Sequence, residues 1–216
     1  MLKLFKKELR LNMPKPVYLF ALMGAMMLIP NYPYIVGIGY SIMHIMIYLQ
    51  FVNENRSQEF SATLPIKRTD IVSSTTLVMV LCQMLNFIVA VICAYPSILI
   101  NPHKFNYVGL DCNFAFFGVA LICLGVFNLV VIPRYFKTGY KYGFTLILGL
   151  IAFVLTYGVF ETLVQAIPPL TKALDSYDKS YLWARLTVLA LGIIIYPLFT
   201  YTANQIAIKK FEKVNL

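Results

Sequence analysis

The sequence predicts an all-α integral membrane protein with six transmembrane helices. Of the 216 residues, 60% are hydrophobic and 12% are charged, whereas soluble domains carry roughly 25% charged residues. So few charges cannot cover the surface of a soluble globule. The apolar residues form long continuous runs rather than the alternating pattern of an outer-membrane barrel. The same composition excludes a disordered chain, and four scattered cysteines argue against a disulfide-stapled domain.

Five runs contain no Asp, Glu, Lys or Arg, and the first, 16–53, is the longest. A helix needs about 20 apolar residues to cross a bilayer, so this run is long enough for two crossings. Pro30 and Pro33 break it, because two prolines at this spacing do not fit a helix interior. Pro96 is expected to end the third span. One domain, 1–216, is predicted, with spans at about 17–30, 34–52, 72–95, 113–133, 143–166 and 184–207.

The positive charges predict the orientation. Fourteen of the 18 Lys and Arg residues fall in alternate connecting segments, namely 1–15, 53–70, 134–142 and 208–216. Cytoplasmic loops carry an excess of Lys and Arg, so both termini are expected to be cytoplasmic. The net charge of +9 is then a topology signal, and no nucleic acid is expected as a partner.

The segment 1–15 is predicted to form an amphipathic helix in the inner headgroup layer. Leu2, Phe5, Leu9 and Met13 recur at helical spacing, while the lysines and Arg10 occupy other faces. Prolines at 14 and 16 end this helix. The alternative is a basic anchor with no further role.

The loop 53–70 is the densest polar stretch of the chain. Asn55 followed by Gln58 resembles a capping box, which predicts a short helix at about 56–63. Asp70 is expected to be the N-cap of the next span.

Phe60 and Leu64 stand out in this loop as large apolar residues on a polar background. A short surface helix of this kind has the right shape to dock into a groove on a partner. The alternative is an ordinary solvated loop.

Two motifs carry a resemblance to a known family. The first motif begins with an acidic residue, Glu59, which is followed by Leu64-Pro65, then Arg68 and then Ile71-Val72. This pattern resembles the first cytoplasmic loop of ABC-2 type transporter permeases. The hairpin 29–34 is similar to that of small bacterial permeases of the phenol-soluble-modulin exporter kind. Larger family members carry a sizeable extracellular domain, for which this chain has no room.

The resemblance implies the transmembrane subunit of an ATP-driven exporter in the bacterial cytoplasmic membrane. It would pair with a second permease copy, as a homodimer or with a close paralogue, and with a separate ATP-binding cassette ATPase that holds ATP and Mg²⁺. The segment 1–15 would be its elbow helix and the loop its coupling helix. The implied ATPase-coupling residues are Glu54, Arg56, Glu59, Phe60, Leu64, Pro65, Lys67 and Arg68.

The resemblance also favours an amphipathic or hydrophobic substrate, such as a cytolytic or antimicrobial peptide. The spans agree with this, because they offer few ionisable groups to bind a hydrophilic ion. Membrane lipid completes the expected partners.

Four polar residues within the predicted spans are candidates for the transport pathway or its outer gate: Glu161, Gln83, Asn86 and Asn128. A carboxylate at membrane depth is a functional candidate by default. The alternative places Glu161 at the interface, where it caps the outer mouth or pairs with Lys172, Lys179 or Arg185. For the three amides, hydrogen bonds between helices are favoured over a role in binding substrate.

Catalysis and metal binding are not expected on this chain. It has no P-loop motif, no HExxH motif and no paired carboxylates within a span, so no catalytic, cofactor or metal residue is predicted. Two other functions stay open. One is an ion-coupled secondary transporter, although the halves 1–111 and 112–216 show no repeat. The other is a non-transporting membrane anchor or immunity protein.

Overall fold

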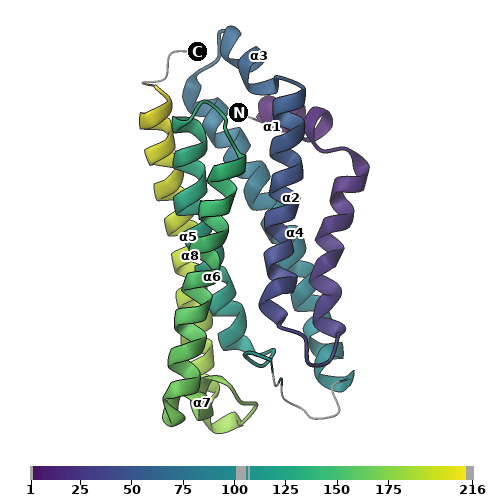
Figure 1. The fold of residues 1–216 in the computed structure, drawn as a ribbon, viewed down its shortest axis with the longest axis vertical. Helices are drawn as coiled ribbons and strands as arrows, with labels where there is room; N and C mark the ends of the chain where they lie inside the picture. Colours follow the sequence, from purple (N-terminus) through teal and green to yellow (C-terminus); the bar gives the residue numbers. More distant parts are fainter. Residues whose placement is uncertain (1, 101–105, 107, 213–216) are drawn as a thin grey trace.

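The computed structural model describes residues 2–100, 106 and 108–212, except for the side chains of Pro16, Glu59 and Ala62, and these residues contain helices and no strand. Six long elements run along the longest axis of the molecule (Figure 1): η1 (Lys15–Leu28), α2 (Tyr34–Glu54), α4 (Arg68–Ile100), α5 (Phe114–Lys137), α6 (Gly143–Ala166) and α8 (Leu182–Phe211). The short helices α1 (Leu2–Asn12) and α3 (Ser57–Thr63) lie at one end, and α7 (Pro168–Leu174) and η2 (Lys179–Tyr181) at the other.

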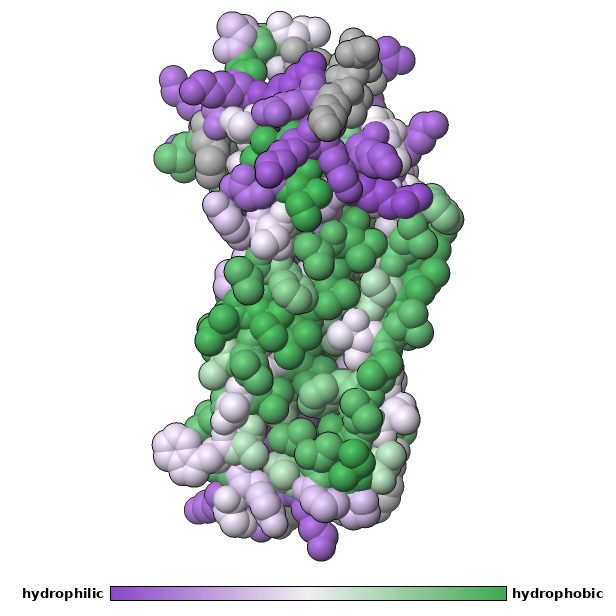
Figure 2. Space-filling model, turned by 90° about the vertical axis from the view of Figure 1, so that its left-hand side faces the viewer, coloured by the Kyte–Doolittle hydropathy of each residue, from purple (hydrophilic) through white to green (hydrophobic). Residues whose placement is uncertain are grey.

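The chain is a multi-pass membrane protein. The helices α2, α4, α5, α6 and α8 are long and apolar enough to cross a membrane, which confirms the all-α class and five of the predicted spans. Figure 2 shows a broad apolar belt between two polar ends, with most of the hydrophilic surface at the upper end. This distribution places the charged residues outside the apolar layer.

The sixth predicted span, 17–30, corresponds to η1, and its apolar part Val17–Leu28 is shorter than the other five helices. η1 is a 14-residue 3₁₀-helix. Because a 3₁₀-helix rises about 2.0 Å per residue, this element extends for roughly 28 Å, close to the thickness of a bilayer core of about 30 Å. A sixth crossing stays a prediction.

The ends of two helices differ from the sequence prediction. α4 continues through Pro96 to Ile100, and α5 continues through Pro133 to Lys137. Packing explains the first case, because the hydroxyl of Ser97 donates a hydrogen bond of 2.5 Å to the carbonyl of Met27 in η1. This contact holds the last turn of α4 against its neighbour beyond the proline.

The predicted capping box and N-cap in the loop 53–70 are wrong. α2 extends to Glu54, so Asn55 ends this helix instead of starting the next. The turn is made by Arg56, whose φ of 45° is left-handed. α4 already begins at Arg68, which places Asp70 within its first turn.

The long elements form two bundles. In the first, η1 packs against α2 and α4, and in the second, α5 packs against α6 and most extensively against α8. Close approach between α5 and α8 depends on Gly118 and Gly192. A Cβ atom on Gly192 would lie 2.3 Å from the carbonyl oxygen of Gly118, so no larger residue fits without backbone movement. Small residues at such crossings favour packing between membrane helices.

We expect Gly192→Ala to destabilise the second bundle by about 1–3 kcal/mol, the usual cost of overpacking a core. The matched control is Gly158→Ala in α6, where a Cβ atom would meet nothing within 4 Å. Thermal unfolding of the detergent-solubilised variants measures the effect. Equal unfolding temperatures for the two variants would contradict the close packing of α5 on α8.

Candidate functional site

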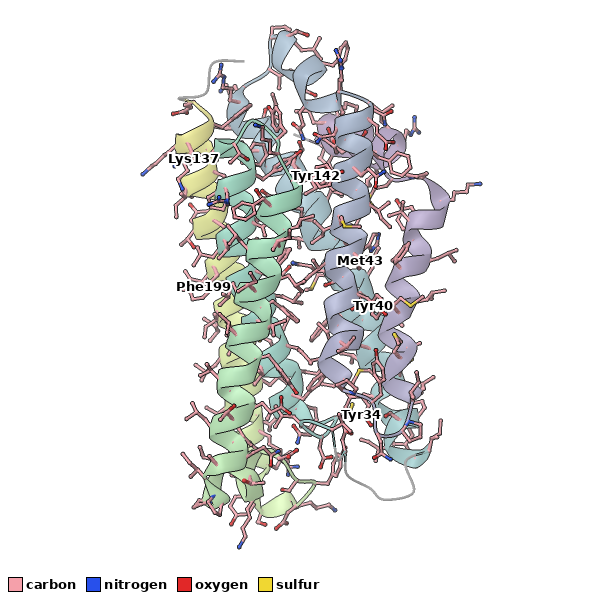
Figure 3. The ribbon with its side chains drawn as sticks, in the orientation of Figure 1. Tyr34, Tyr40, Met43, Lys137, Tyr142 and Phe199 are labelled. Carbon is pink, nitrogen blue, oxygen red and sulfur yellow. The ribbon has the colours of Figure 1, made fainter. Side chains whose placement is uncertain are left out.

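The end of the molecule that carries α1 also carries one end of each of the six long elements. Nη1 of Arg68 donates to the carbonyl of Phe211 at 2.8 Å, which joins the start of α4 to the end of α8. Lys137 and Tyr142 lie near this end as well, whereas Tyr34 lies near the opposite end (Figure 3). We call the α1 end the basic end, because most of the Lys and Arg residues fall in its connecting segments.

A buried carboxylate organises the basic end. Glu8 of α1 is only 2% exposed. Its Oε2 accepts hydrogen bonds from Nδ2 of Asn12 at 2.6 Å and from the hydroxyl of Tyr48 in α2 at 3.1 Å. Its Oε1 accepts from the hydroxyl of Ser57 in α3 at 3.3 Å and lies 3.0 Å from Nζ of Lys7. One carboxylate therefore ties three helices together.

The neighbours of Glu8 bind α3 directly. Nζ of Lys7 donates to the carbonyl of Ser57 at 3.1 Å and to the hydroxyl of Ser61 at 2.6 Å. Nδ2 of Asn12 donates to the hydroxyl of Ser57 at 2.9 Å, and Nδ2 of Asn55 donates to Oδ1 of Asn12 at 3.1 Å. We name Lys7, Glu8, Asn12, Tyr48, Ser57 and Ser61 the Glu8 network.

A further hydrogen bond ties α3 to the membrane helices. Nε2 of Gln58 donates to the hydroxyl of Thr75 in α4 at 2.6 Å. α3 is thus bound to α1 through Ser57 and Ser61 and to α4 through Gln58. A displacement of α3 must move one or both of these helices.

The opposite side of α3 is exposed. Phe60 of α3 is 59% exposed, and Leu64, which directly follows the helix, is 37% exposed, so both large apolar residues are available for contact. Two hollows lie next to α3 and the segment that follows it. One of about 460 Å³ is lined by Lys3, Pro65 and Lys67 among others, and another of about 280 Å³ includes Arg56 and Lys141 in its lining.

The other residues predicted for coupling differ in their surroundings. Glu54 and Arg56 are exposed, and Oε1 of Glu54 accepts a hydrogen bond from Nε2 of Gln50 at 2.8 Å. Arg68 is used within the fold, where it binds the last carbonyls of α8 and lies over the ring of Phe211. The side chain of Glu59 lies outside the described residues.

Lys7, Glu8 and Tyr48 were not predicted as site residues. Of the predicted apolar face, Phe5 and Leu9 are partly buried and Met13 is buried, whereas Leu2 is exposed. The buried positions within α1 itself are Leu4, Glu8 and Asn12. These three recur every fourth residue, which is a helical spacing. Glu8 is also the only acidic residue in 1–15. Its helical spacing from Leu4 and Asn12 and its charge, opposite to that of its neighbours, were the features of the sequence that could have identified it.

The amides predicted at membrane depth join the two bundles. Nε2 of Gln83 donates to Oδ1 of Asn128 at 2.8 Å, and Nδ2 of Asn128 donates back to Oε1 of Gln83 at 3.0 Å. The hydroxyl of Tyr196 in α8 donates to the same Gln83 oxygen at 2.7 Å, and Thr200 accepts from Asn128 at 2.9 Å. Both amide side chains are buried and are used in interhelical hydrogen bonds.

Asn86 makes a bond within the first bundle, where its Nδ2 donates to the carbonyl of Gly37 in α2 at 3.2 Å. A second link between the bundles lies nearer the basic end. The hydroxyl of Thr76 in α4 donates to Oδ1 of Asn204 in α8 at 3.0 Å, and Nδ2 of Asn204 donates to the hydroxyl of Ser73 at 3.2 Å. Among the described residues, no group of three metal-ligating side chains is present.

Glu161 lies in the last turns of α6, near the end opposite to α1. A Cβ atom on Gly109 would lie 3.0 Å from Oε1 of Glu161 and 3.2 Å from the hydroxyl of Tyr157, and Gly109 has a φ of +117°. A loop passing this close to α6 therefore needs a glycine. No ion pair joins Glu161 to Lys172, Lys179 or Arg185, all of which are described, so the predicted pairing is not formed.

The same loop carries a buried acid. Asp111 is 2% exposed. Burial raises the pKa of this carboxyl to about 7, and the nearby carboxylate of Asp175 also raises it. The hydrogen bond from the backbone N–H of Asn106 acts in the opposite direction and lowers this pKa. The backbone N–H of Asp111 donates to Oδ1 of Asp175 at 2.7 Å.

An apolar groove of about 380 Å³ lies between α2 and α6, where the two bundles meet. Val36, Tyr40 and Met43 line it from α2, and Leu150 and Tyr157 are among the lining residues from α6. Tyr40 and Met43 lie midway along α2 (Figure 3). The groove has an almost entirely apolar lining with the hydroxyls of two tyrosines.

We expect Glu8→Ala to detach α3 from α1. Removing one partner of a buried ion pair typically lowers the free energy of unfolding by about 3–5 kcal/mol, because the remaining groups are left unsatisfied. For Glu8→Ala we expect a loss of about 3 kcal/mol or more. Limited proteolysis in the segment 55–67 and thermal unfolding measure the change. Lys6→Ala is the control, since Lys6 is exposed on the same helix. Indistinguishable behaviour of the two variants would refute the role of Glu8.

Asp111 predicts a dependence of stability on pH. A carboxyl whose pKa is raised in the folded state stabilises the fold when it is protonated, and this contribution is lost as the pH rises from about 4 to about 7. Asp111→Asn removes the loss. The unfolding temperature of the variant should therefore rise relative to that of the unmodified protein across this range. Asp178→Asn is the control. If the difference in unfolding temperature between Asp111→Asn and the unmodified protein did not change with pH, Asp111 would not be a buried acid with a raised pKa.

Comparison with known proteins agrees with this architecture. A family model described as an ABC-2 family transporter protein matches residues 3–212, nearly the whole chain. Searches of curated proteins and of solved structures found no match. Proteins of the matched family are membrane transport components that generally work with ABC ATPase partners. The chain belongs to the ABC-2 family of transporter proteins.

Proposed function

We propose that this chain is the transmembrane subunit of an ATP-driven exporter and that α3 is its coupling helix. The observation that carries the proposal is the combination of a fixed and an exposed side on α3. The Glu8 network and Gln58 hold one side, while Phe60 and Leu64 are presented on the other. A helix that is held on one side and apolar on the other is suited to transmit a push from a bound partner.

The basic end is the cytoplasmic end in this proposal. The excess of Lys and Arg in its segments supports this orientation. η1 is the sixth span, because it connects α1 at the basic end to Tyr34 at the other. α1 is the elbow helix, and its exposed Leu2 and Leu11 contact the headgroup layer of the bacterial cytoplasmic membrane.

The partner is an ABC ATPase that carries ATP and Mg²⁺. Its contact surface needs an apolar groove for Phe60 and Leu64 and an acidic rim. The cations Lys3, Lys67, Arg56 and Lys141 outnumber the one carboxylate, Asp70, among the described residues that line the two hollows. ATP binding closes the ATPase subunits and moves α3. α1 and α4 follow, because α3 is bound to both.

The two bundles are the parts that move. Between α4 and the second bundle the interface includes the Gln83–Asn128 pair and the Thr76–Asn204 bond. Hydrogen bonds between membrane helices contribute only about 0.6 kcal/mol on average, so they can be exchanged without great loss. A push on the first bundle therefore changes the width of the apolar groove between α2 and α6.

This groove is the contact surface for the substrate and faces a second copy of the permease or a close paralogue. The substrate is amphipathic or hydrophobic, because the lining offers tyrosine hydroxyls and apolar side chains but no charge. A cytolytic or antimicrobial peptide has this chemistry.

We expect Phe60→Glu to abolish binding of the ATPase, because a charged side chain cannot enter an apolar groove without losing its hydration. The spans should stay folded, since Phe60 is exposed. Co-purification of the tagged permease with its ATPase measures binding, and thermal unfolding checks the fold.

Lys6→Glu is the matched control, because Lys6 is exposed at the same end but on α1 and has no assigned contact. Unchanged co-purification of the ATPase with the Phe60→Glu variant would overturn the assignment of α3.

A further inference from the structure

Besides the groove between α2 and α6, another hollow lies between the two bundles, at the end opposite to α1. α4 runs diagonally across the molecule, so its lower half diverges from α5 and α8 (Figure 1). The space between them is about 430 Å³, within the range of roughly 300–1,000 Å³ that is usual for ligand pockets. Its lining is mostly apolar and includes Phe87, Val91, Ala94, Ile98, Phe117 and Leu189.

Two cations line the same pocket, Lys179 and Arg185. Arg185 is 4% exposed, and its Nη1 and Nη2 donate to the backbone carbonyls of Ser176 and Asp178. Its Nε has no hydrogen-bond partner. No acidic residue is among the described residues that line the pocket. Next to the pocket, hydrogen bonds with Ser180 and the charge of Arg185 lower the pKa of the Asp178 carboxyl.

Aromatic side chains mark the depth of this pocket in the membrane. Trp183 is 81% exposed and Tyr95 is 71% exposed. Exposed Trp and Tyr of membrane proteins gather at the level of the lipid headgroups. The cationic part of the pocket therefore lies near the headgroups, and the apolar part lies among the acyl chains.

We propose that this pocket binds one anionic phospholipid of the leaflet at this end of the molecule. One acyl chain lies between α4 and α5, and the phosphate lies near Lys179 and Arg185. Charge-assisted hydrogen bonds to phosphate are stronger than neutral ones. The proposal requires only that the chain spans a bilayer, and it does not depend on an ATPase.

The experiment is lipid binding by the full chain in detergent, measured by native mass spectrometry with thermal unfolding as a second readout. Phosphatidylglycerol should bind about tenfold more tightly than phosphatidylcholine of the same chain length, the effect of one hydrogen bond to a charged group. Lys179→Gln should reduce this preference. Lys172→Gln is the control, since Lys172 is also exposed at this end but does not line the pocket.

A second pair of variants tests the apolar part. Ala94→Phe fills the pocket and should abolish the preference, whereas Ala190→Phe on the exposed side of α8 should keep it. Equal affinity for the two lipids, or equal behaviour of the two phenylalanine variants, would overturn the proposal. Glycerol phosphate that binds as tightly as phosphatidylglycerol would show that the pocket takes a free anion instead of a lipid.

Discussion

The apolar interior of the bilayer is the constraint on which this structure depends. Polar groups at membrane depth must find partners inside the protein, because lipid offers none. Gln83 and Asn128 meet this requirement by bonding to each other, with Tyr196 and Thr200 at the remaining positions. Elsewhere the helices pack through close contact, as at Gly118 and Gly192. The result is two tightly packed bundles that are joined in part through a few hydrogen bonds.

At the basic end a carboxylate has the organising role that the amides have within the spans. Glu8 can be buried there because Asn12, Tyr48 and Ser57 donate hydrogen bonds to it and Lys7 pairs with it. The network turns α1, α2 and α3 into one unit and leaves Phe60 exposed. An interfacial helix, a surface helix and a membrane span are thus connected mechanically, which a membrane subunit driven from outside the bilayer requires.

Composition and continuous apolar runs were sufficient to predict the all-α class and five spans, because crossing a bilayer demands length and hydrophobicity whatever the packing. Features set by packing were not predictable. α4 passes through Pro96 because Ser97 binds η1. The cap predicted at Asn55 is replaced by the left-handed turn at Arg56. The face of α1 was predicted correctly for Phe5, Leu9 and Met13 but not for Leu2, because contacts with α2 and α3 bury Glu8 and Asn12 instead. The exposure of Phe60 and Leu64 could be predicted from their polar surroundings, whereas the network that fixes them joins residues far apart in the chain.

The central claim is that α3 contacts an ATPase through the side that Phe60 occupies. Photo-crosslinking tests it most directly, with a photoreactive amino acid at position 60 in cells that hold the native partner. The account predicts one crosslinked species with a nucleotide-binding subunit, and none from the same probe at Leu11 on α1. Crosslinks to that subunit from position 11 but not from position 60 would contradict the account, because the partner would then bind α1 and leave α3 free.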